Sequence, residues 1–559
     1  MTLRSRRTGL ALAALVACAH PARAQRVLGL GGDASTLPAG VLRVTLGSLW
    51  DRANERYDAD GKLHGLGAAA STMAFDGRFD SRLATAGPLV QALSGAAAFD
   101  ASLGTLSVGR RDASVDNVVA VDVGLLSRLT IGARVRVASH AIEPDAVLNP
   151  RRIEGTMGFN PAWTNTAARD LNHALLTQFD SAVAQTTRRI AQCQGAPATA
   201  GCAAIVQNVA GAQSLVATAA DFANALNALY GGRGSAAGLP FVPISSGAAQ
   251  LAINQRVLGF RDRFAALGAA GIGAQGPVGG ALFSPTDLGM LLTDSLYGYL
   301  MRPLRTVHAY GLGDISVHLK ARLFQTTGDD TASIHGFAVR QAAQFSLRVV
   351  GGSLPAADEP FAPVTGDAGR GFVVQSFTDL FYGSRYSATV IVGVDRQQSQ
   401  EFAMRMPSFY APAVGGVAFP LQLASREVRV TRTPGTRLDI GITPRVAVTR
   451  SFWLGASWTF SRQAADAWGV SHIPVAPQGE PTVSELDAPG WAPGTAWTEQ
   501  RLALGGTYST VRATREGRAR AAFDVSYQHE QTLAGSGWRV AHLSRDVLTL
   551  RWYPRIWGR

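Results

Sequence analysis

Charged side chains recur at every second position in several segments of the chain, opposite a face of aliphatic residues. In residues 312–324, for example, Asp314, His318 and Lys320 alternate with isoleucine, valine and leucine. This period of two predicts β-strands with one polar and one apolar face. If the strands close into a barrel whose apolar face contacts lipid, nine ionisable residues are predicted to face the lumen: Asp122, Arg134, Arg136, Asp314, His318, Lys320, Arg322, Arg340 and Arg348.

Two roles are open to these nine side chains. Rings of arginine around a lumen would favour anionic solutes. Alternatively, the same charges would pair with acidic side chains or with loops and fill a narrow barrel. Which face of each strand points inward is clearer than which of these roles applies, because a charge on the lipid-facing side would cost roughly 2–4 kcal/mol at the bilayer midplane.

The sequence lacks the residue patterns of common catalytic sites. It contains no Gly-x-Ser-x-Gly elbow, Walker loop or His-Glu-x-x-His helix. His140 and Glu143 are three residues apart but have no third ligand nearby, and Asp58-Ala59-Asp60-Gly61 lacks the remaining ligands of a calcium loop. His318 and Ser316 share a strand face without a third member of a catalytic triad. We therefore expect no enzyme, no metal site and no cofactor.

The N-terminus predicts export from the cytoplasm. Arginines precede the apolar stretch Leu10–Val16, and Ala22-Arg23-Ala24 fits a signal-peptidase site, so residues 1–24 are predicted to be a signal peptide. An alternative is lipidation at Cys18, because Leu15-Val16-Ala17-Cys18 resembles a lipobox. The net charge of +12 lies mostly on arginines that form no run after the first few residues, so we expect no nucleic-acid partner.

Beyond the signal peptide, alternation dominates residues 130–140 and the chain beyond residue 311, and residues 25–140 and 306–559 are predicted to form the barrel strands. Some predicted strands are joined by short polar turns, such as residues 124–128, and others by long polar stretches, such as 395–435. Short turns at one end and long loops at the other are typical of outer-membrane barrels. The pattern predicts an all-β transmembrane antiparallel barrel of about 12–14 strands; a secreted β-sandwich is the alternative. The two weakest of the predicted strands are 63–75 and 103–111.

Residues 141–305 follow a different pattern. Leu175, Phe179, Val183 and Ile190 have helical spacing, and similar runs follow as far as residue 300. The segment therefore predicts an inserted α-helical domain on one rim of the barrel, expected to be extracellular. Cys193 and Cys202 are close in sequence, so in an oxidising compartment they predict a disulfide between the first two helices, with two free thiols as the alternative.

Two short motifs resemble a known family of barrels. The hairpin from Val121 to Gly132 is similar to one in Gram-negative outer-membrane barrels that are grouped with meta-pathway phenol-degradation proteins and are related to fatty-acid and aromatic-hydrocarbon transporters. Gly311-Leu312-Gly313-Asp314-Ile315 resembles the opening of a later strand in that family. The resemblance covers about 50 residues and implies transport of hydrophobic compounds. The large helical insertion and the ending Trp557-Gly558-Arg559 depart from it.

Together these features predict a channel in the cell outer membrane for passive uptake of small hydrophobic or anionic solutes. The expected partners are outer-membrane lipid, a small-molecule solute and the barrel assembly machinery. The alternative function is a surface binding or adhesion protein whose barrel only anchors the helical domain. A lumen blocked along its whole length, with no lateral opening, would favour that alternative.

Overall fold

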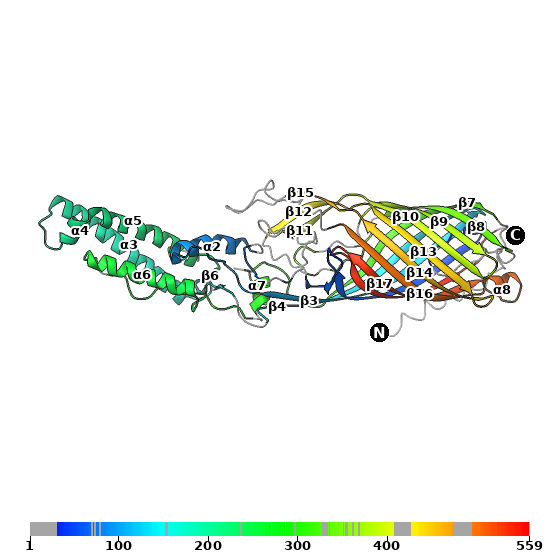
Figure 1. The fold of residues 1–559 in the computed structure, drawn as a ribbon, viewed down its shortest axis with the longest axis horizontal. Coiled ribbons are helices and arrows are strands. Elements are labelled where there is room, and N and C mark those ends of the chain that lie inside the picture. The colour runs from blue at the N-terminus through cyan, green and yellow to red at the C-terminus, as the bar shows by residue number, and fades with distance from the viewer. Residues whose placement is uncertain are drawn as a thin grey trace.

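The computed structural model describes residues 31–557 apart from several gaps, the longest of which are 327–333, 407–425 and 473–494. The predicted signal peptide and the alternative lipidation site at Cys18 lie outside the described residues. The described chain forms a long β-barrel, and an elongated helical domain extends from one end of it (Figure 1).

Twelve antiparallel strands close the barrel. The largest sheet has thirteen strands, but β2 (Leu63–Gly65) pairs only with the end of β1, and β1 also pairs with β18 to complete the ring. In ring order the strands are β1 (Leu42–Tyr57), β3 (Leu106–Leu126), β4 (Leu129–Leu148), β7 (Val307–Gln325), β8 (Phe337–Val349), β9 (Gly371–Tyr382), β10 (Tyr386–Gln397), β13 (Arg437–Ala447), β14 (Phe452–Gln463), β16 (Trp497–Ser509), β17 (Phe523–Ser536) and β18 (Ala541–Trp552).

The two weakest predicted strands do not add members to this ring. In the segment predicted as one strand over residues 63–75, the three-residue β2 is the only strand among the residues that the structure describes. Alternation predicts two separate strands over residues 103–111 and 115–124. Residues 106–111 and 115–124 both belong to the 21-residue strand β3, because β3 stays paired with β4 from Leu106 to Leu126. One continuous strand therefore replaces two predicted ones.

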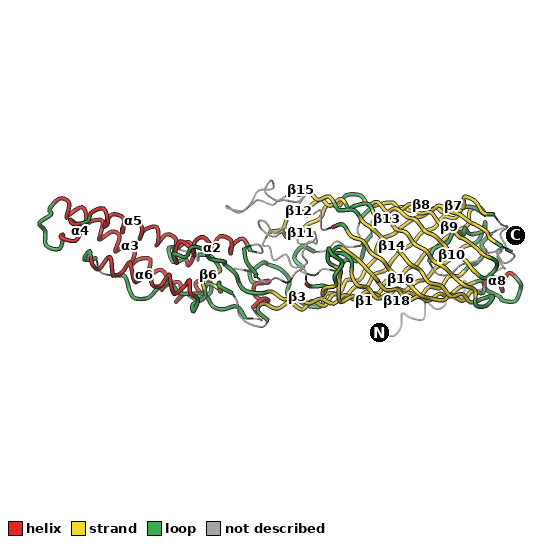
Figure 2. Tube along the Cα trace, viewed as in Figure 1, coloured by secondary structure: helices red, strands yellow, loops and turns green. Residues whose placement is uncertain are grey.

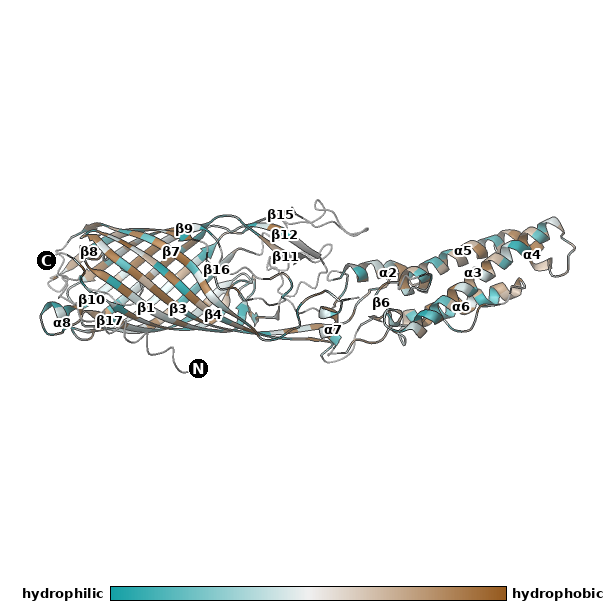
Figure 3. Cartoon of the chain, turned by 180° about the vertical axis from the view of Figure 1, so that it is seen from behind, coloured by the Kyte–Doolittle hydropathy of each residue, from teal (hydrophilic) through white to brown (hydrophobic). Residues whose placement is uncertain are grey.

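The outer surface of the barrel is a belt of aliphatic and aromatic side chains. Side chains that face away from the lumen, such as Leu319, Phe345, Leu347 and Leu504, are 43–59% exposed. Figure 3 shows the alternation of apolar and polar positions along the strands. Burying an apolar outer band in lipid is favourable, and ring closure leaves no strand edge in lipid without a hydrogen-bonding partner.

The helical domain consists of α2 (Ser81–Ser94), α3 (Thr166–Gly195), α4 (Ala203–Gln207), α5 (Val209–Tyr230), α6 (Ala248–Ala266) and α7 (Asp287–Thr293), with two short strands, β5 (Met157–Phe159) and β6 (Phe241–Pro243), and a 3-10 turn at Pro161–Trp163. Its core includes the mutually packed rings of Phe179, Phe222 and Phe260. None of the described helices is both long and apolar enough to cross a membrane.

Helix α2 lies in a part of the chain that was predicted to form barrel strands. Leu83, Ala86, Val90 and Leu93 are all buried, at a helical spacing that packs against α5 and α6. The helical domain therefore draws on two connections of the barrel: the one between β1 and β3, and the one between β4 and β7 (Figure 1). The predicted boundary at residue 140 also differs, because β4 continues to Leu148.

A buried polar cluster stabilises the base of this domain. The Asp80 carboxylate caps α2 by accepting a hydrogen bond from the backbone N–H of Arg82 at 2.8 Å, and it also accepts one from the Tyr299 hydroxyl. Burial and then the neighbouring Asp80 raise the pKa of the Tyr299 hydroxyl well above its ordinary value. Tyr299 therefore stays protonated and remains a donor to Asp80 at neutral pH.

Cys193 and Cys202 form a disulfide at the far tip of the domain, with their Cα atoms 5.3 Å apart. Both are buried beside Ile190 and Ile205. Replacing both cysteines by serine is expected to lower the free energy of unfolding of the helical domain by about 2–3 kcal/mol, because the bond closes a short loop. Denaturant unfolding followed by circular dichroism measures this change, and reducing the wild-type protein should reproduce it. An unchanged midpoint would refute the prediction.

The two ends of the barrel differ. Residues 127–128, 383–385 and 448–451 make short turns at the end away from the helical domain, where the short helix α8 (Val511–Arg515) also lies. At the other end are the long connections, including a small sheet of β11 (Gln400–Met406), β12 (Arg426–Thr433) and β15 (Ala467–His472) (Figure 2). This asymmetry matches the prediction of short turns opposite long loops.

Candidate functional site in the barrel lumen

The lumen contains a cavity of about 880 Å³. Residues from most strands of the ring line it, together with Gly31, Gly32 and Asp33 from the segment that precedes β1. This volume lies within the range of small-molecule sites. The wall is mixed, with charged side chains on several strands and the apolar side chains of Phe377 and Ile391 on one side.

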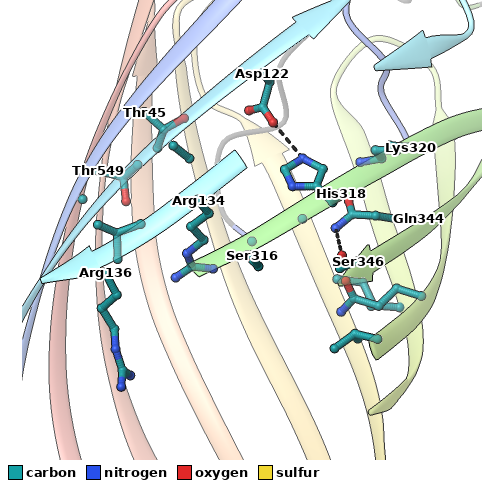
Figure 4. Close-up of a pocket in the computed structure, with 18 of the residues that line it drawn as sticks. Thr45, Asp122, Arg134, Arg136, Ser316, His318, Lys320, Gln344, Ser346 and Thr549 are labelled. Atoms are coloured by element: carbon teal, nitrogen blue, oxygen red, sulfur yellow. Dashed lines mark hydrogen bonds and ion pairs between the residues drawn. The ribbon is translucent and has the colours of Figure 1, made fainter. Parts of the chain in front are cut away.

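Seven of the nine residues predicted to face the lumen line this cavity: Asp122, Arg134, Arg136, Asp314, His318, Lys320 and Arg348. Figure 4 shows several of them on β4 and β7. Arg322 and Arg340 do not line it. Arg322 hydrogen-bonds to Gln325 at 2.8 Å, and Arg340 is 3% exposed and bound to Asp379 at 2.6 Å. Both residues occupy inward-facing positions on their strands, but they lie nearer the short turns, where the lumen is filled.

Five further arginines on the wall were not singled out from the sequence: Arg43, Arg437, Arg501, Arg545 and Arg551. The sequence pattern could have identified them, because they occupy the polar positions of the same alternation. Arg437 precedes Leu438 and Ile440, for example, in a segment already predicted to be a strand. The contribution of Asp33 had no such signal, because it lies outside any strand.

Most cations of the wall are neutralised by acidic side chains of the barrel. The pairs, with their nitrogen–oxygen distances, are Arg43–Asp122 (2.8 Å), Arg136–Asp116 (3.4 Å), Arg348–Asp395 (2.6 Å), Arg437–Asp439 (2.8 Å), Arg501–Glu530 (2.7 Å), Arg545–Asp51 (2.7 Å) and Arg551–Asp524 (3.4 Å). Lys320 donates to the backbone carbonyl of Asp33. Pairing therefore accounts for most of the predicted arginine lining, which agrees with the filling role weighed above.

The segment from Gly31 to Val41 lies inside the barrel at the short-turn end, and we call it the N-terminal plug. Its backbone N–H groups at Ala34 and Leu37 donate to Asp379 at 3.0 Å and to Thr130 at 2.8 Å. Its side chains pack on the ring: Leu37 and Val41 contact Val511, Ala522 and Tyr553, which lie at or near that end. The plug fills part of the lumen between the cavity and the short-turn end, together with the buried side chains of Arg340, Asp379 and Arg445.

The contrast between the two faces of the ring decides what kind of barrel this is. The outward side chains are apolar, while the inward side chains are charged and surround a cavity. A soluble barrel would bury apolar residues inside, whereas a membrane barrel exposes them to lipid. The molecule is an outer-membrane β-barrel.

No protein-family model matches the chain, and no curated protein matches its sequence. Solved structures that are similar include an outer-membrane channel from Pseudomonas putida F1, with 8% identity and a TM-score of 0.39 over 94% of this chain and 98% of that one. A FadL homologue from Pseudomonas aeruginosa has 7% identity and a TM-score of 0.26 over 97% and 99% of the two chains. The CymD monoaromatic hydrocarbon channel has 6% identity and a TM-score of 0.24 over 93% and 90%.

Two glycines of the hairpin from Val121 to Gly132 leave room for features of the lumen. A Cβ on Gly132 would lie 2.1 Å from Oδ1 of Asp122, which is bound to Nε2 of His318 at 2.7 Å (Figure 4). A Cβ on Gly124 would lie 2.1 Å from the backbone oxygen of Pro38 in the plug. Glycine at these positions therefore permits the contact between Asp122 and His318 across β4 and the close approach of the plug to β3.

Proposed function

We propose that this barrel is a channel through which small hydrophobic or anionic solutes cross the outer membrane passively, without a cofactor and without catalysis. The observation that carries the proposal is the cavity inside a closed ring, with the N-terminal plug between it and the short-turn end. A barrel that served only as an anchor would gain nothing from an 880 Å³ cavity in its lumen.

The wall suits solutes that carry both polar and apolar groups. Arginines and hydroxyl groups lie around one part of the cavity, and Phe377, Ile391 and Val373 lie on β9 and β10. Mixed pockets of this size bind small organic molecules by burying apolar surface and by placing a few polar groups. We further propose that the end with the helical domain is extracellular, since long loops of outer-membrane barrels face outward. The lipid of that membrane and the barrel assembly machinery are the proposed partners in addition to the solute.

A liposome-swelling assay with the refolded full-length protein tests the channel. Proteoliposomes diluted into isotonic solutions of small sugars, amino acids or organic acids are expected to swell faster than empty liposomes, and the rate should fall as solute size increases. Heat-modifiable migration on gels verifies that the barrel is folded. A folded barrel that admits no solute in this assay and carries no current in planar bilayers would refute the proposal.

That negative outcome would favour the alternative, in which the barrel anchors a surface-binding domain. One observation supports this alternative: the helical domain has a large core around Phe179, Phe222 and Phe260, which continues into the ends of β3 and β4, and it projects beyond the barrel (Figure 1). A domain of this kind could contact other molecules without any contribution from the lumen. Both functions predict the same membrane location, so solute flux is the measurement that separates them.

A further inference from the structure

Arg134 differs from every other cation on the cavity wall. Nine cationic side chains line the cavity, and seven of the arginines have a carboxylate of the barrel within 4 Å, while Lys320 donates to a plug carbonyl. Among the described residues, no ion pair or hydrogen bond reaches the guanidinium of Arg134, and its side chain stays largely exposed to the lumen. An arginine without a partner in a narrow lumen retains all of its donors for a solute.

The immediate neighbours of Arg134 on the wall carry no carboxylate, although Asp122 and Asp314 line other parts of the same cavity. Its cross-strand partners are Ala120 on β3 and Ser316 on β7, and the lumen-facing positions before and after it on β4 are Gly132 and Arg136. Three of these four residues are small, and none carries a carboxylate. Figure 4 shows Arg134 and Arg136 extending into the cavity from β4, with Ser316 on the adjacent strand. The register thus places the Ser316 hydroxyl on the strand position directly opposite Arg134.

The pair of guanidiniums on β4 favours an anion over a neutral solute. Arg134 and Arg136 are two residues apart on one strand face, so their like charges repel, and a bound anion would relieve that repulsion. The Asp116 carboxylate, 3.4 Å from Arg136, is also shared with His140 at 3.2 Å. Planar carboxylates match the donor fork of arginine, and charge-assisted hydrogen bonds of this kind are stronger than neutral ones.

We propose that Arg134 and Ser316 bind the carboxylate of a small organic acid inside the lumen, with Arg136 adding positive charge. The apolar side chains of the same cavity, such as Val118 on β3, would contact the hydrocarbon part of that acid. This inference deepens the proposed channel function and rests on it, because it names a subsite on the path and a class of solute, the monovalent carboxylate.

Binding is tested on the refolded full-length protein in detergent by isothermal titration calorimetry at low ionic strength. The probes are sodium benzoate and benzamide, which differ in charge but hardly in shape. Wild-type protein is expected to bind benzoate at least tenfold more tightly than benzamide. Arg134→Gln should weaken benzoate binding at least tenfold, because the unpaired guanidinium is gone. Ala120→Asp should do the same with Arg134 still present, because it supplies the missing carboxylate from the neighbouring strand.

Arg52→Gln is the control, since it removes the same charge from β1 at a position that does not line the cavity. It should leave benzoate affinity unchanged. The proposal is overturned if benzamide binds as tightly as benzoate, if both Arg134→Gln and Ala120→Asp bind benzoate like the wild type, or if Arg52→Gln weakens binding as much as Arg134→Gln. Binding in detergent requires no transport, so a protein that binds benzoate but admits no solute would refute the channel function alone.

Discussion

Deleting residues 31–38, with the signal sequence left in place, is expected to raise the single-channel conductance severalfold. In the intact protein this stretch fills the lumen between the cavity and the short turns, held by hydrogen bonds from Ala34 to Asp379 and from Leu37 to Thr130. Its removal leaves all strand pairs of the ring unchanged, because β1 begins at Leu42. Planar-bilayer recordings of the two proteins measure the difference.

A synthetic peptide with the sequence of residues 31–41 provides the control for this deletion. Added on the short-turn side of the truncated barrel, it should reduce the conductance, because the groups that bind the plug are still present; a peptide of scrambled sequence should have no effect. Equal conductance of the full-length and truncated barrels would show that the plug does not block the path. The plug would then have only a structural role at that end of the barrel.

The alternation of side chains predicted the ring and its inward face because lipid on one side and a polar lumen on the other impose a period of two on every strand. Helix α2 was missed, although Leu83, Ala86, Val90 and Leu93 carry its helical spacing. Pro88 inside the helix obscures that pattern, since proline usually ends a helix.

Features that depend on distant parts of the chain could not be predicted. The plug has no periodicity, and its binding groups lie on β4, β7 and β9, far away in sequence. Pairing of the arginines depends on strand register: Arg340 lies directly opposite Asp379, but the connection between β8 and β9 is long and does not fix that register. For the same reason the sequence could not single out Arg134. That no acid lies directly opposite it becomes clear only when its partners on β3 and β7 are known.

Asp379→Ala is expected to lower the free energy of unfolding of the barrel by about 3–5 kcal/mol, because it leaves a buried arginine without a counter-charge. Asp379 is fully buried and accepts hydrogen bonds from Nε of Arg340 at 2.9 Å, from its Nη2 at 2.6 Å, and from the hydroxyl of Thr389 at 2.7 Å. Urea titration measures this loss of free energy, with the mobility of the barrel on gels reporting the folded fraction. Replacing Arg340 by methionine in the same protein should restore most of this free energy, because the guanidinium that lost its counter-charge is then removed.

Asp395→Ala is the matched control, because Asp395 also accepts from an arginine of β8, Arg348, at 2.6 Å. Those two side chains are 11% and 15% exposed beside the cavity, so water can hydrate the guanidinium that remains. Removing the Asp395 carboxylate should therefore lower the free energy of unfolding by about 1 kcal/mol or less. Equal losses of free energy for Asp379→Ala and Asp395→Ala would contradict the argument from burial.

Asp379→Ala also removes the acceptor of the Ala34 N–H, so it should increase the conductance, whereas Asp395→Ala leaves the plug in place. A loss of stability without that increase would mean that the remaining contacts of the plug hold it in the lumen, and that Asp379 acts on the ring alone.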